Sequence, residues 1–221
     1  MKNIICLIFT GLFFIHKIAL AVDVDIKSEE AREWANNKGH ELIQVLGTKD
    51  IVEKHSKLDK MLTEDVNLDY ISKFVIGKYL KTMNKDQKRR YSALFERYIL
   101  SLYKQFNLHF DSSDIAFSID NVVEHPKFTV VSCSIDANNI LKNIENLEIE
   151  RLPVEFRLIR GKENRIQAVD IEISNVSMVI EYRKKFYKMI MEENEEIEWF
   201  LEKFEDKIIA NEMAASRVSN L

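Results

Sequence analysis

Between residues 28 and 80 the hydrophobic residues recur at intervals of three and four, which is the period of an amphipathic helix. Helices are therefore expected over 28–46, about 49–63 and 66–80. The first of them places Glu29 and Glu30 in its opening turn, where negative charge favours the positive end of the helix dipole. The first half of the chain is thus predicted to be helical.

A fourth helix is predicted over 85–106, and its hydrophobic stripe is unusually aromatic. Asn84 and Gln87 form a capping-box pattern at its start. The stripe consists of Tyr91, Leu94, Phe95, Tyr98, Ile99, Leu102, Tyr103 and Phe106. Such a stripe has two interpretations, an ordinary core or one wall of a ligand cavity, because periodicity does not distinguish a filled interior from a hollow one.

From about residue 113 the period of the hydrophobic pattern changes to two. Strands are predicted around Ile115–Ile119, at Phe128–Asp136, at Leu152–Arg160 and around 165–174. One face of the third strand carries Val154, Phe156 and Leu158, and one face of the fourth carries Val169, Ile171 and Ile173. Two further helices follow, over 176–190 and 192–213. This order predicts an α+β fold in which helices cover one face of a four-stranded antiparallel sheet.

The N-terminus has the features of a secretory signal peptide. Lys2 precedes an uncharged apolar run, and Ala19-Leu20-Ala21 provides a small-x-small cleavage site. We therefore expect a signal peptide at 1–21 and a single domain at 22–221, with an uncleaved signal anchor as the alternative. The domain would keep one cysteine, Cys133, so it has no internal disulfide, and Cys133 is interpreted as a small apolar strand residue.

Composition and motifs argue against several classes of function. Hydrophobic residues make up 46% of the chain and charged residues 31%, with a formal net charge of −4, so no basic field attracts nucleic acid. No zinc-spaced histidine pair, nucleophile elbow or phosphate-binding loop is present. Asp170 and Glu172 share one strand face and are interpreted as part of a solvated surface. No enzyme, metal site or cofactor is expected.

Two segments resemble the MlaC family of periplasmic phospholipid-binding proteins, also called the toluene-tolerance family. They are "LDYISKFVIGKYLKTMNKDQKRRYSALFERYILSLY" and "VDIEISNVSMVIEYRKKF". The matching positions are Asp69, Ile71, Phe74, Gly77, Lys78, Tyr79, Gln87, Arg89, Arg90, Tyr91, Phe95, Tyr98, Tyr103, Asp170, Val176, Ser177, Tyr182, Arg183 and Phe186. The chain departs from the family at Leu80 and Ile166, where tryptophan is usual, and at Asn175, where glycine is usual.

The resemblance implies an NTF2-like, cone-shaped fold in which helices pack on a twisted four-stranded antiparallel sheet around an internal lipid cavity. It also implies a periplasmic carrier that moves glycerophospholipids between the outer and inner membranes and so maintains outer-membrane lipid asymmetry. The implied partners are an inner-membrane ABC transporter complex and an outer-membrane lipoprotein–porin complex. Two alternatives stay open: a structural or adaptor protein with a solid core, and a small-molecule enzyme of cone-shaped α+β fold.

On this resemblance, we expect the cavity to lie between the helix 85–106 and the sheet. The residues expected to contact lipid are Phe74, Tyr79, Phe95, Tyr98, Leu102, Phe156, Leu158, Val169, Ile171, Ile173 and Met178. The basic residues expected to meet a headgroup or an acidic partner are Lys78, Arg89, Arg90 and Arg183.

Overall fold

The computed structural model describes residues 25–104, 115–136 and 151–218. The predicted signal peptide at 1–21 lies outside these residues. The helices are α1 (Ser28–Leu46), α2 (Ile51–Asp65), α3 (Leu68–Ile76), the 3-10 helix η1 (Gly77–Lys81), α4 (Lys85–Lys104), the 3-10 helix η3 (Lys162–Asn164), α6 (Met178–Glu192) and α7 (Ile197–Val218). In the described ranges, no helix is long and apolar enough to cross a membrane.

The strands form one antiparallel sheet in the order β1-β2-β3-β4-β5. They are β1 (Ala116–His125), β2 (Phe128–Asp136), β3 (Arg151–Arg160), β4 (Ile166–Ile173) and β5 (Val176–Ser177). The predicted α+β class and the four main strands are confirmed, and β5 adds a fifth strand of two residues. Because each strand pairs with its neighbour in the chain, the sheet needs no crossover connection.

Helix α1 covers the apolar face of the sheet, and together they form the sheet cluster. Its buried members are Ile26, Ala31, Ala35, Val131, Cys133, Leu158 and Ala168. Trp34 meets the ring of Phe156 edge-on, with 6.1 Å between ring centroids. Gly39 permits the close approach, since a Cβ there would lie 2.5 Å from the ring of Phe117. The interpretation of Cys133 as an apolar strand residue agrees with its burial beneath α1.

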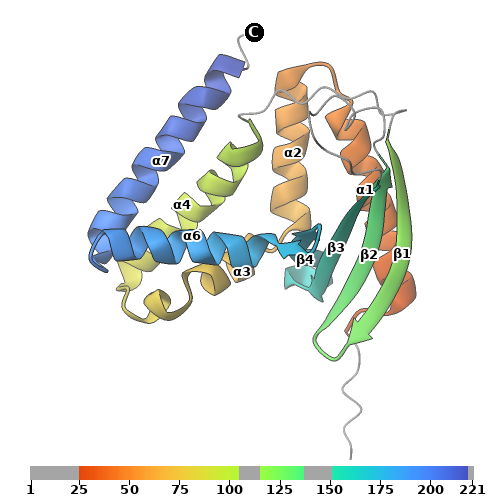
Figure 1. The fold of residues 1–221 in the computed structure, drawn as a ribbon, viewed down its shortest axis with the longest axis horizontal. Helices are drawn as coiled ribbons and strands as arrows, with labels where there is room; N and C mark the ends of the chain where they lie inside the picture. Colours follow the sequence, from red (N-terminus) through yellow and green to blue (C-terminus); the bar gives the residue numbers. More distant parts are fainter. Residues whose placement is uncertain (1–24, 105–114, 137–150, 219–221) are drawn as a thin grey trace, which may run out of the picture.

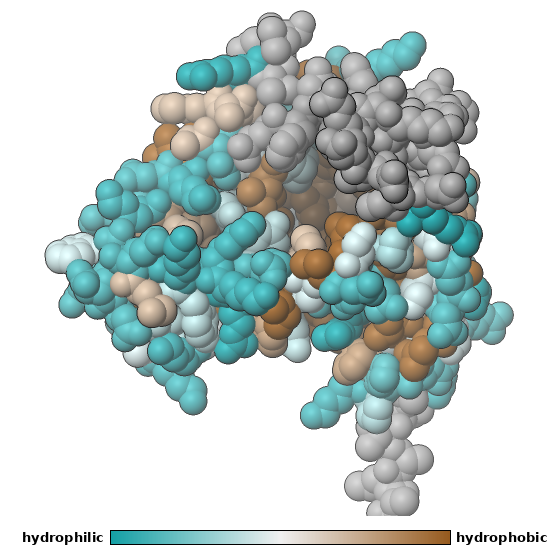
Figure 2. Space-filling model, viewed as in Figure 1, coloured by the Kyte–Doolittle hydropathy of each residue, from teal (hydrophilic) through white to brown (hydrophobic). Residues whose placement is uncertain are grey.

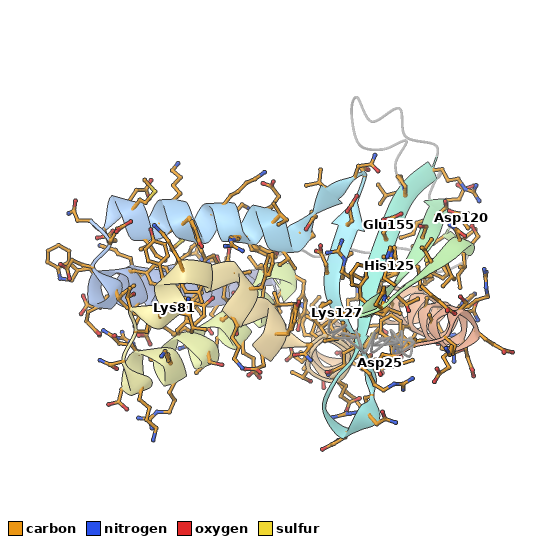
Figure 3. The ribbon with its side chains drawn as sticks, turned by 90° about the horizontal axis from the view of Figure 1, so that it is seen from below. Asp25, Lys81, Asp120, His125, Lys127 and Glu155 are labelled. Atoms are coloured by element: carbon orange, nitrogen blue, oxygen red, sulfur yellow. The ribbon has the colours of Figure 1, made fainter. Side chains whose placement is uncertain are left out.

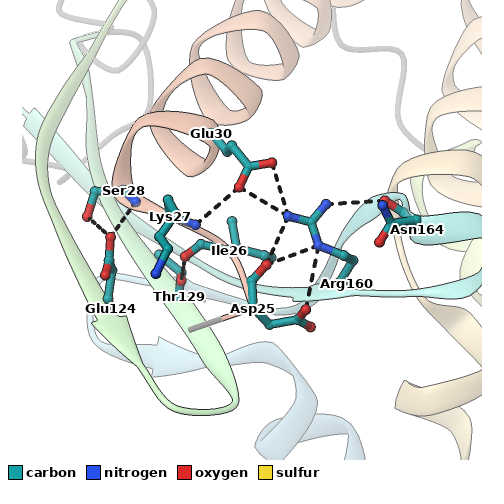
Figure 4. Close-up of polar contacts among 9 residues, drawn as sticks. All are labelled: Asp25, Ile26, Lys27, Ser28, Glu30, Glu124, Thr129, Arg160 and Asn164. Carbon is teal, nitrogen blue, oxygen red and sulfur yellow. Dashed lines mark hydrogen bonds and ion pairs between the residues drawn. The ribbon is translucent and has the colours of Figure 1, made fainter. Parts of the chain in front are cut away.

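Polar contacts fix the start of α1 to the ends of two inner strands, β2 and β3 (Figure 4). Arg160 on β3 donates to the backbone carbonyl of Asp25 at 2.9 Å and to the carboxylate of Glu30 at 3.0 Å. Thr129 on β2 donates to the carbonyl of Ile26 at 2.7 Å. Since Arg160 is 18% exposed at its side chain, these contacts are partly shielded from water, and they hold α1 in register with the strands.

The aromatic stripe of α4 packs on other helices. It lies along α7 and against α3, while α6 completes the helical side of the molecule (Figure 1). This helical cluster has a centre of aromatic rings: Tyr91, Phe95, Tyr98, Phe186, Phe200 and Phe204. The centroids of Phe186 and Phe204 are 4.9 Å apart, and those of Tyr98 and Phe204 are 5.2 Å apart. The expectation that the aromatic rings of this stripe face the sheet is therefore wrong, because the two C-terminal helices bury them. Ile99 of the stripe does lie beside the sheet, where it shares a cavity lining with Ile171 of β4.

Helix ends follow the sequence signals closely. Asn84 and Gln87 cap α4 reciprocally, with the backbone N–H of each donating to the side chain of the other at 3.0 and 2.9 Å. This confirms the predicted capping box.

Asn175, in place of the family's glycine, has φ of 62° in the β4–β5 turn, a left-handed conformation that asparagine tolerates better than most residues.

The helical cluster depends on its central rings. Replacing Phe186, which is 1% exposed and contacts five other rings, by alanine should lower the free energy of unfolding by about 3–5 kcal/mol. Replacing Ile180 by alanine should change the free energy of unfolding by less than about 1 kcal/mol, because Ile180 lies on the same helix but is 41% exposed. Urea unfolding measures both values, and equal effects would contradict the assignment of Phe186 to the core.

Candidate functional site

An apolar cavity lies where the helical cluster meets the sheet cluster. Figure 2 shows hydrophobic side chains gathered in this central region, between the helices on the left and the sheet on the right. The cavity, called here the seam cavity, has a volume of about 150 Å³. Its walls are Leu62 and Val66 of the α2 segment, Leu68 and Ile71 of α3, Ile99 of α4, Ala168, Asp170 and Ile171 of β4, and Met178, Val179 and Tyr182 of α6.

Asp170 is the one carboxylate in this lining, and its oxygens are fully engaged. It is 8% exposed, and it accepts the hydroxyl of Ser177 at 2.6 Å and the backbone N–H of Val179 at 3.2 Å. Ser177 in turn accepts the N–H of Ile180 at 3.2 Å. The carboxylate therefore sits at the positive end of α6, where the helix dipole favours it. It orders the turn from β5 into α6, and the cavity remains apolar.

The phenols that border the cavity are neutral. Tyr182 lines it, and burial raises the pKa of Tyr182. Burial and the neighbouring Tyr182 raise the pKa of Tyr98 to about 12, and the two rings meet edge-on at 6.1 Å. Neutral phenols add polarizable, apolar surface beside Ile99 and Met178. The chemistry of the cavity thus suits hydrocarbon, since its one carboxylate, Asp170, is hydrogen-bonded to Ser177 and Val179.

One polar link joins α2 to α4 above the cavity. The carboxylate of Asp59 on α2 accepts the hydroxyl of Tyr103 and forms an ion pair with Lys104 at 2.7 Å. Burial and the hydrogen bond to Asp59 raise the pKa of Tyr103. The ring of His55, also on α2, meets the ring of Tyr103 edge-on at 6.2 Å. These side chains close the seam between α2 and α4.

A wider, more polar pocket of about 530 Å³ opens beyond this link, between α2, α4 and α7. We call it the upper pocket; it is lined by His55, Arg97, Leu100, Ser101, Lys104, Glu212, Ala215 and Ser216. Arg97 forms ion pairs with Glu212 at 3.0 Å and with Glu205 at 3.5 Å. The Nε2 atom of His55 is buried and has no hydrogen-bond partner among the described residues. The upper pocket is thus more polar than the seam cavity, and its lining contains cations from α4.

A groove of about 370 Å³ adjoins the seam cavity at Asp170 and Val179, which line both, and we call it the outer groove. Phe74, Val169 and Ile180 line it together with Arg157 and Glu172. A β-bulge causes this placement: Arg157 pairs with Asp170 but Leu158 pairs with Ala168, which leaves Val169 unpaired. The strict alternation predicted for this strand is therefore wrong at Val169, which lies on the outer groove and not beside Ile171.

The structure distributes the residues expected to contact lipid over several environments. Ile171 and Met178 line the seam cavity. Phe74 and Val169 line the outer groove. Tyr79, Phe95 and Tyr98 are buried in the helical cluster, with Leu102 packed against it. Leu158 is buried in the sheet cluster, with Phe156 packed against it. Ile173 is half-buried at the end of β4, opposite Val176.

The four expected headgroup or docking cations lie apart from the seam cavity. Arg90 forms ion pairs with Glu198 and Glu205 of α7 at 2.5 and 3.0 Å. Lys78 lies 3.6 Å from Glu195, and Arg89 lies 2.9 Å from Asp86. Arg183 stacks on the ring of Phe74 and donates to the hydroxyl of Tyr187 at 3.0 Å. Each of the four cations thus contacts a neighbouring side chain.

Several cavity residues were missed by the sequence analysis. Leu62 and Val66 lie one helical turn apart on the α2 side of the seam, and Ile99 belongs to the α4 stripe. The spacing of Leu62 and Val66 was a usable signal of one apolar face. Within the described residues, no group of His, Cys, Asp and Glu side chains could hold a metal ion.

Comparisons with known proteins identify the family and support the fold. A family model described as MlaC protein matches residues 40–206. No curated protein matches the chain. Among solved structures, the phospholipid-binding protein from Ralstonia solanacearum, determined in complex with a phospholipid, is similar, with a TM-score of 0.65 and 12% sequence identity. The match covers 82% of this chain and 98% of that chain, and at this identity the likeness concerns the fold.

The link between α2 and α4 can be tested by hydrogen exchange. Asp59→Asn removes the ion pair with Lys104, and we expect a loss of about 1 kcal/mol in stability and faster exchange in α2 than in α7. The control is Asp86→Asn, which breaks an exposed ion pair within α4 and should leave α2 unchanged. Unchanged exchange in α2 of the Asp59→Asn protein would show that the link does not hold the seam.

His55 should make stability depend on pH. Burial, with Lys104 nearby, lowers the pKa of His55 below its ordinary value of 6.5. As the pH falls below about 6.5, the unfolded chain takes up a proton on His55 and the native chain does not. The free energy of unfolding is therefore highest above pH 6.5 and decreases as the pH falls below it. The free energy of unfolding should decrease between about pH 7.5 and about pH 5.5, and the decrease should be smaller for His55→Gln than for the wild type. Identical differences would contradict a buried neutral His55.

Proposed function

The chain belongs to the MlaC protein family, and from this premise we propose that it binds a glycerophospholipid whose acyl chains lie along the seam between the two clusters. The observation that carries the proposal is the apolar cavity at this seam. The Ralstonia solanacearum protein, which shares the fold, was determined with a phospholipid bound, and this supports the same ligand class for the present chain.

The size of the seam cavity sets a condition on binding. A methylene group needs about the room of one liquid water, roughly 30 Å³, so about 150 Å³ accommodates on the order of five methylenes. Two acyl chains contain about 30. The cavity must therefore widen several-fold to accept a lipid. Because each cluster is closely packed, the widening is proposed to occur between them, by movement of α2 away from α4.

The seam also gives the bound lipid an orientation. Its floor is apolar at Ile171 and Met178, whereas the upper pocket contains Lys104 and His55. Acyl chains would occupy the floor, and the phosphate would remain at the upper pocket, close to water and to a cation. Separation of Asp59 from Lys104 during opening would free the Lys104 ammonium for the phosphate.

Energetics explain why such a carrier is needed. About 30 methylenes, at roughly 0.8 kcal/mol each, make exposure of both chains to water cost on the order of 20 kcal/mol. Transfer from a bilayer into an apolar protein interior is close to neutral, because lipid tails are as apolar as Leu or Phe side chains. A carrier with an apolar seam and few charged contacts can therefore both load and release its lipid.

The cellular role is proposed from the family and the N-terminus together. Residues 1–21 would direct export to the periplasm, and 22–221 would act as one lipid-binding domain. There the protein would shuttle glycerophospholipids between an outer-membrane lipoprotein–porin complex and an inner-membrane ABC transporter complex, and so preserve the asymmetry of the outer membrane. No catalytic step is part of this role.

Native mass spectrometry of protein purified without detergent tests the proposal. We expect an added mass of one diacyl phospholipid, and we expect Ile171→Trp to lose it because the indole would fill the seam cavity. The control is Val123→Trp on β1, where the side chain is 41% exposed. A folded wild-type protein that carries and takes up no lipid would contradict the proposal and favour an adaptor with a solid core.

A further inference from the structure

A fourth concave surface lies on the helical side, between α3, η1 and α4. We call it the basic groove; its volume is about 420 Å³. Lys73, Lys81, Lys88 and Arg89 line it, with Asp69 as the one acidic residue among the lining residues. Figure 3 shows Lys81 on the helical side of the molecule, well away from Glu155 and Asp120 on the sheet.

The charge of this groove is opposite to that of the whole chain. Four cations and one carboxylate give the lining a formal charge of +3, whereas the full chain carries −4. Lys73 pairs with Asp69, and Arg89 with Asp86, but both pairs are solvent-exposed and strongly screened. Among the described residues, Lys81 and Lys88 make no ion pair, so their charges are available to a ligand.

The floor of the groove is apolar. Leu80 is half-buried, and the ring of Tyr91 is 1% exposed and belongs to the helical cluster. The hydroxyl of Tyr91 donates to the carbonyl of Ser72 at 2.9 Å, and burial raises the pKa of Tyr91, so its polar end needs no further partner. A ligand would therefore meet a hydrophobic floor with ammonium and guanidinium groups around its rim.

We propose that the basic groove is the docking site for an acidic segment of a partner protein. Such a segment would place an apolar side chain on Leu80 and Tyr91 and its carboxylates beside Lys81, Lys88 and Lys73. The concave shape favours a narrow chain segment over a flat lipid surface, because a bilayer cannot reach a recessed floor. Charge complementarity of this kind selects the partner and speeds its association.

The position of the groove separates docking from lipid binding. Helix α3 has Leu68 and Ile71 on the seam cavity and Lys73 on the basic groove, so the two sites occupy different sides of one helix. A partner could therefore bind while a lipid occupies the seam. The inference goes beyond the proposed carrier function and does not require it, since an adaptor protein could use the same groove.

Selection of random peptides displayed on phage against the full-length protein tests the proposal. The enriched peptides should be acidic and contain a large apolar residue. Their affinity, measured by fluorescence anisotropy, should fall about tenfold or more in Lys81→Glu/Lys88→Glu and should decrease with added salt. The matched control is Lys203→Glu/Lys207→Glu on the exposed face of α7, which changes the net charge equally and should alter the affinity less than about twofold.

Three outcomes would overturn the inference. They are enrichment of peptides that are not acidic, an equal loss of affinity in both double variants, and binding of phosphatidylglycerol vesicles through the same lysines in place of acidic peptides. Native mass spectrometry of both variants keeps the two claims apart: unchanged lipid content with lost peptide binding supports the docking site, whatever the wild type carries.

Discussion

The whole structure depends on one constraint: its apolar residues close into two separate clusters that meet along a seam. The aromatic rings of α4, α6 and α7 bury one another, and α1 buries the apolar face of the sheet. The two clusters have separate buried members and meet at the seam cavity, which Ala168 of one and Ile71 and Val179 of the other line together. The contact between them is therefore the part of the fold that can change with the least loss of burial, and the seam cavity lies there.

The two ends of the seam are held by contacts that differ in their exposure to water. Asp170 fixes the start of α6 to β4 through buried hydrogen bonds, so the base of the seam is firmly held. At the opposite end, Asp59 joins α2 to α4 through side chains that are partly exposed to water. Breaking partly exposed ion pairs costs little free energy. The arrangement thus favours a hinge near Asp170 and an opening near Asp59.

The sequence allowed the elements to be predicted better than their packing. Period and capping signals located the strands and the start of α4 at Asn84, because these depend on local residues. The partner of the α4 stripe was misjudged, since a stripe does not reveal which apolar surface covers it. The bulge at Val169 also had no local signal, because it arises from the pairing of β4 with β3. Of the residues expected to contact lipid, Ile171 and Met178 line the seam cavity. The spacing of Leu62 and Val66 indicated one apolar face, but which surface that face meets is seen only in the structure.

The central claim is that the two clusters separate when a lipid enters. Pulsed electron paramagnetic resonance measures this directly, with nitroxides on the exposed residues Val123 of the sheet side and Lys188 of the helical side. The account predicts that the distance between these labels increases on lipid loading, while the distance between labels on Lys188 and Lys203, both on the helical side, stays constant. Lipid binding with no change in the first distance would contradict it.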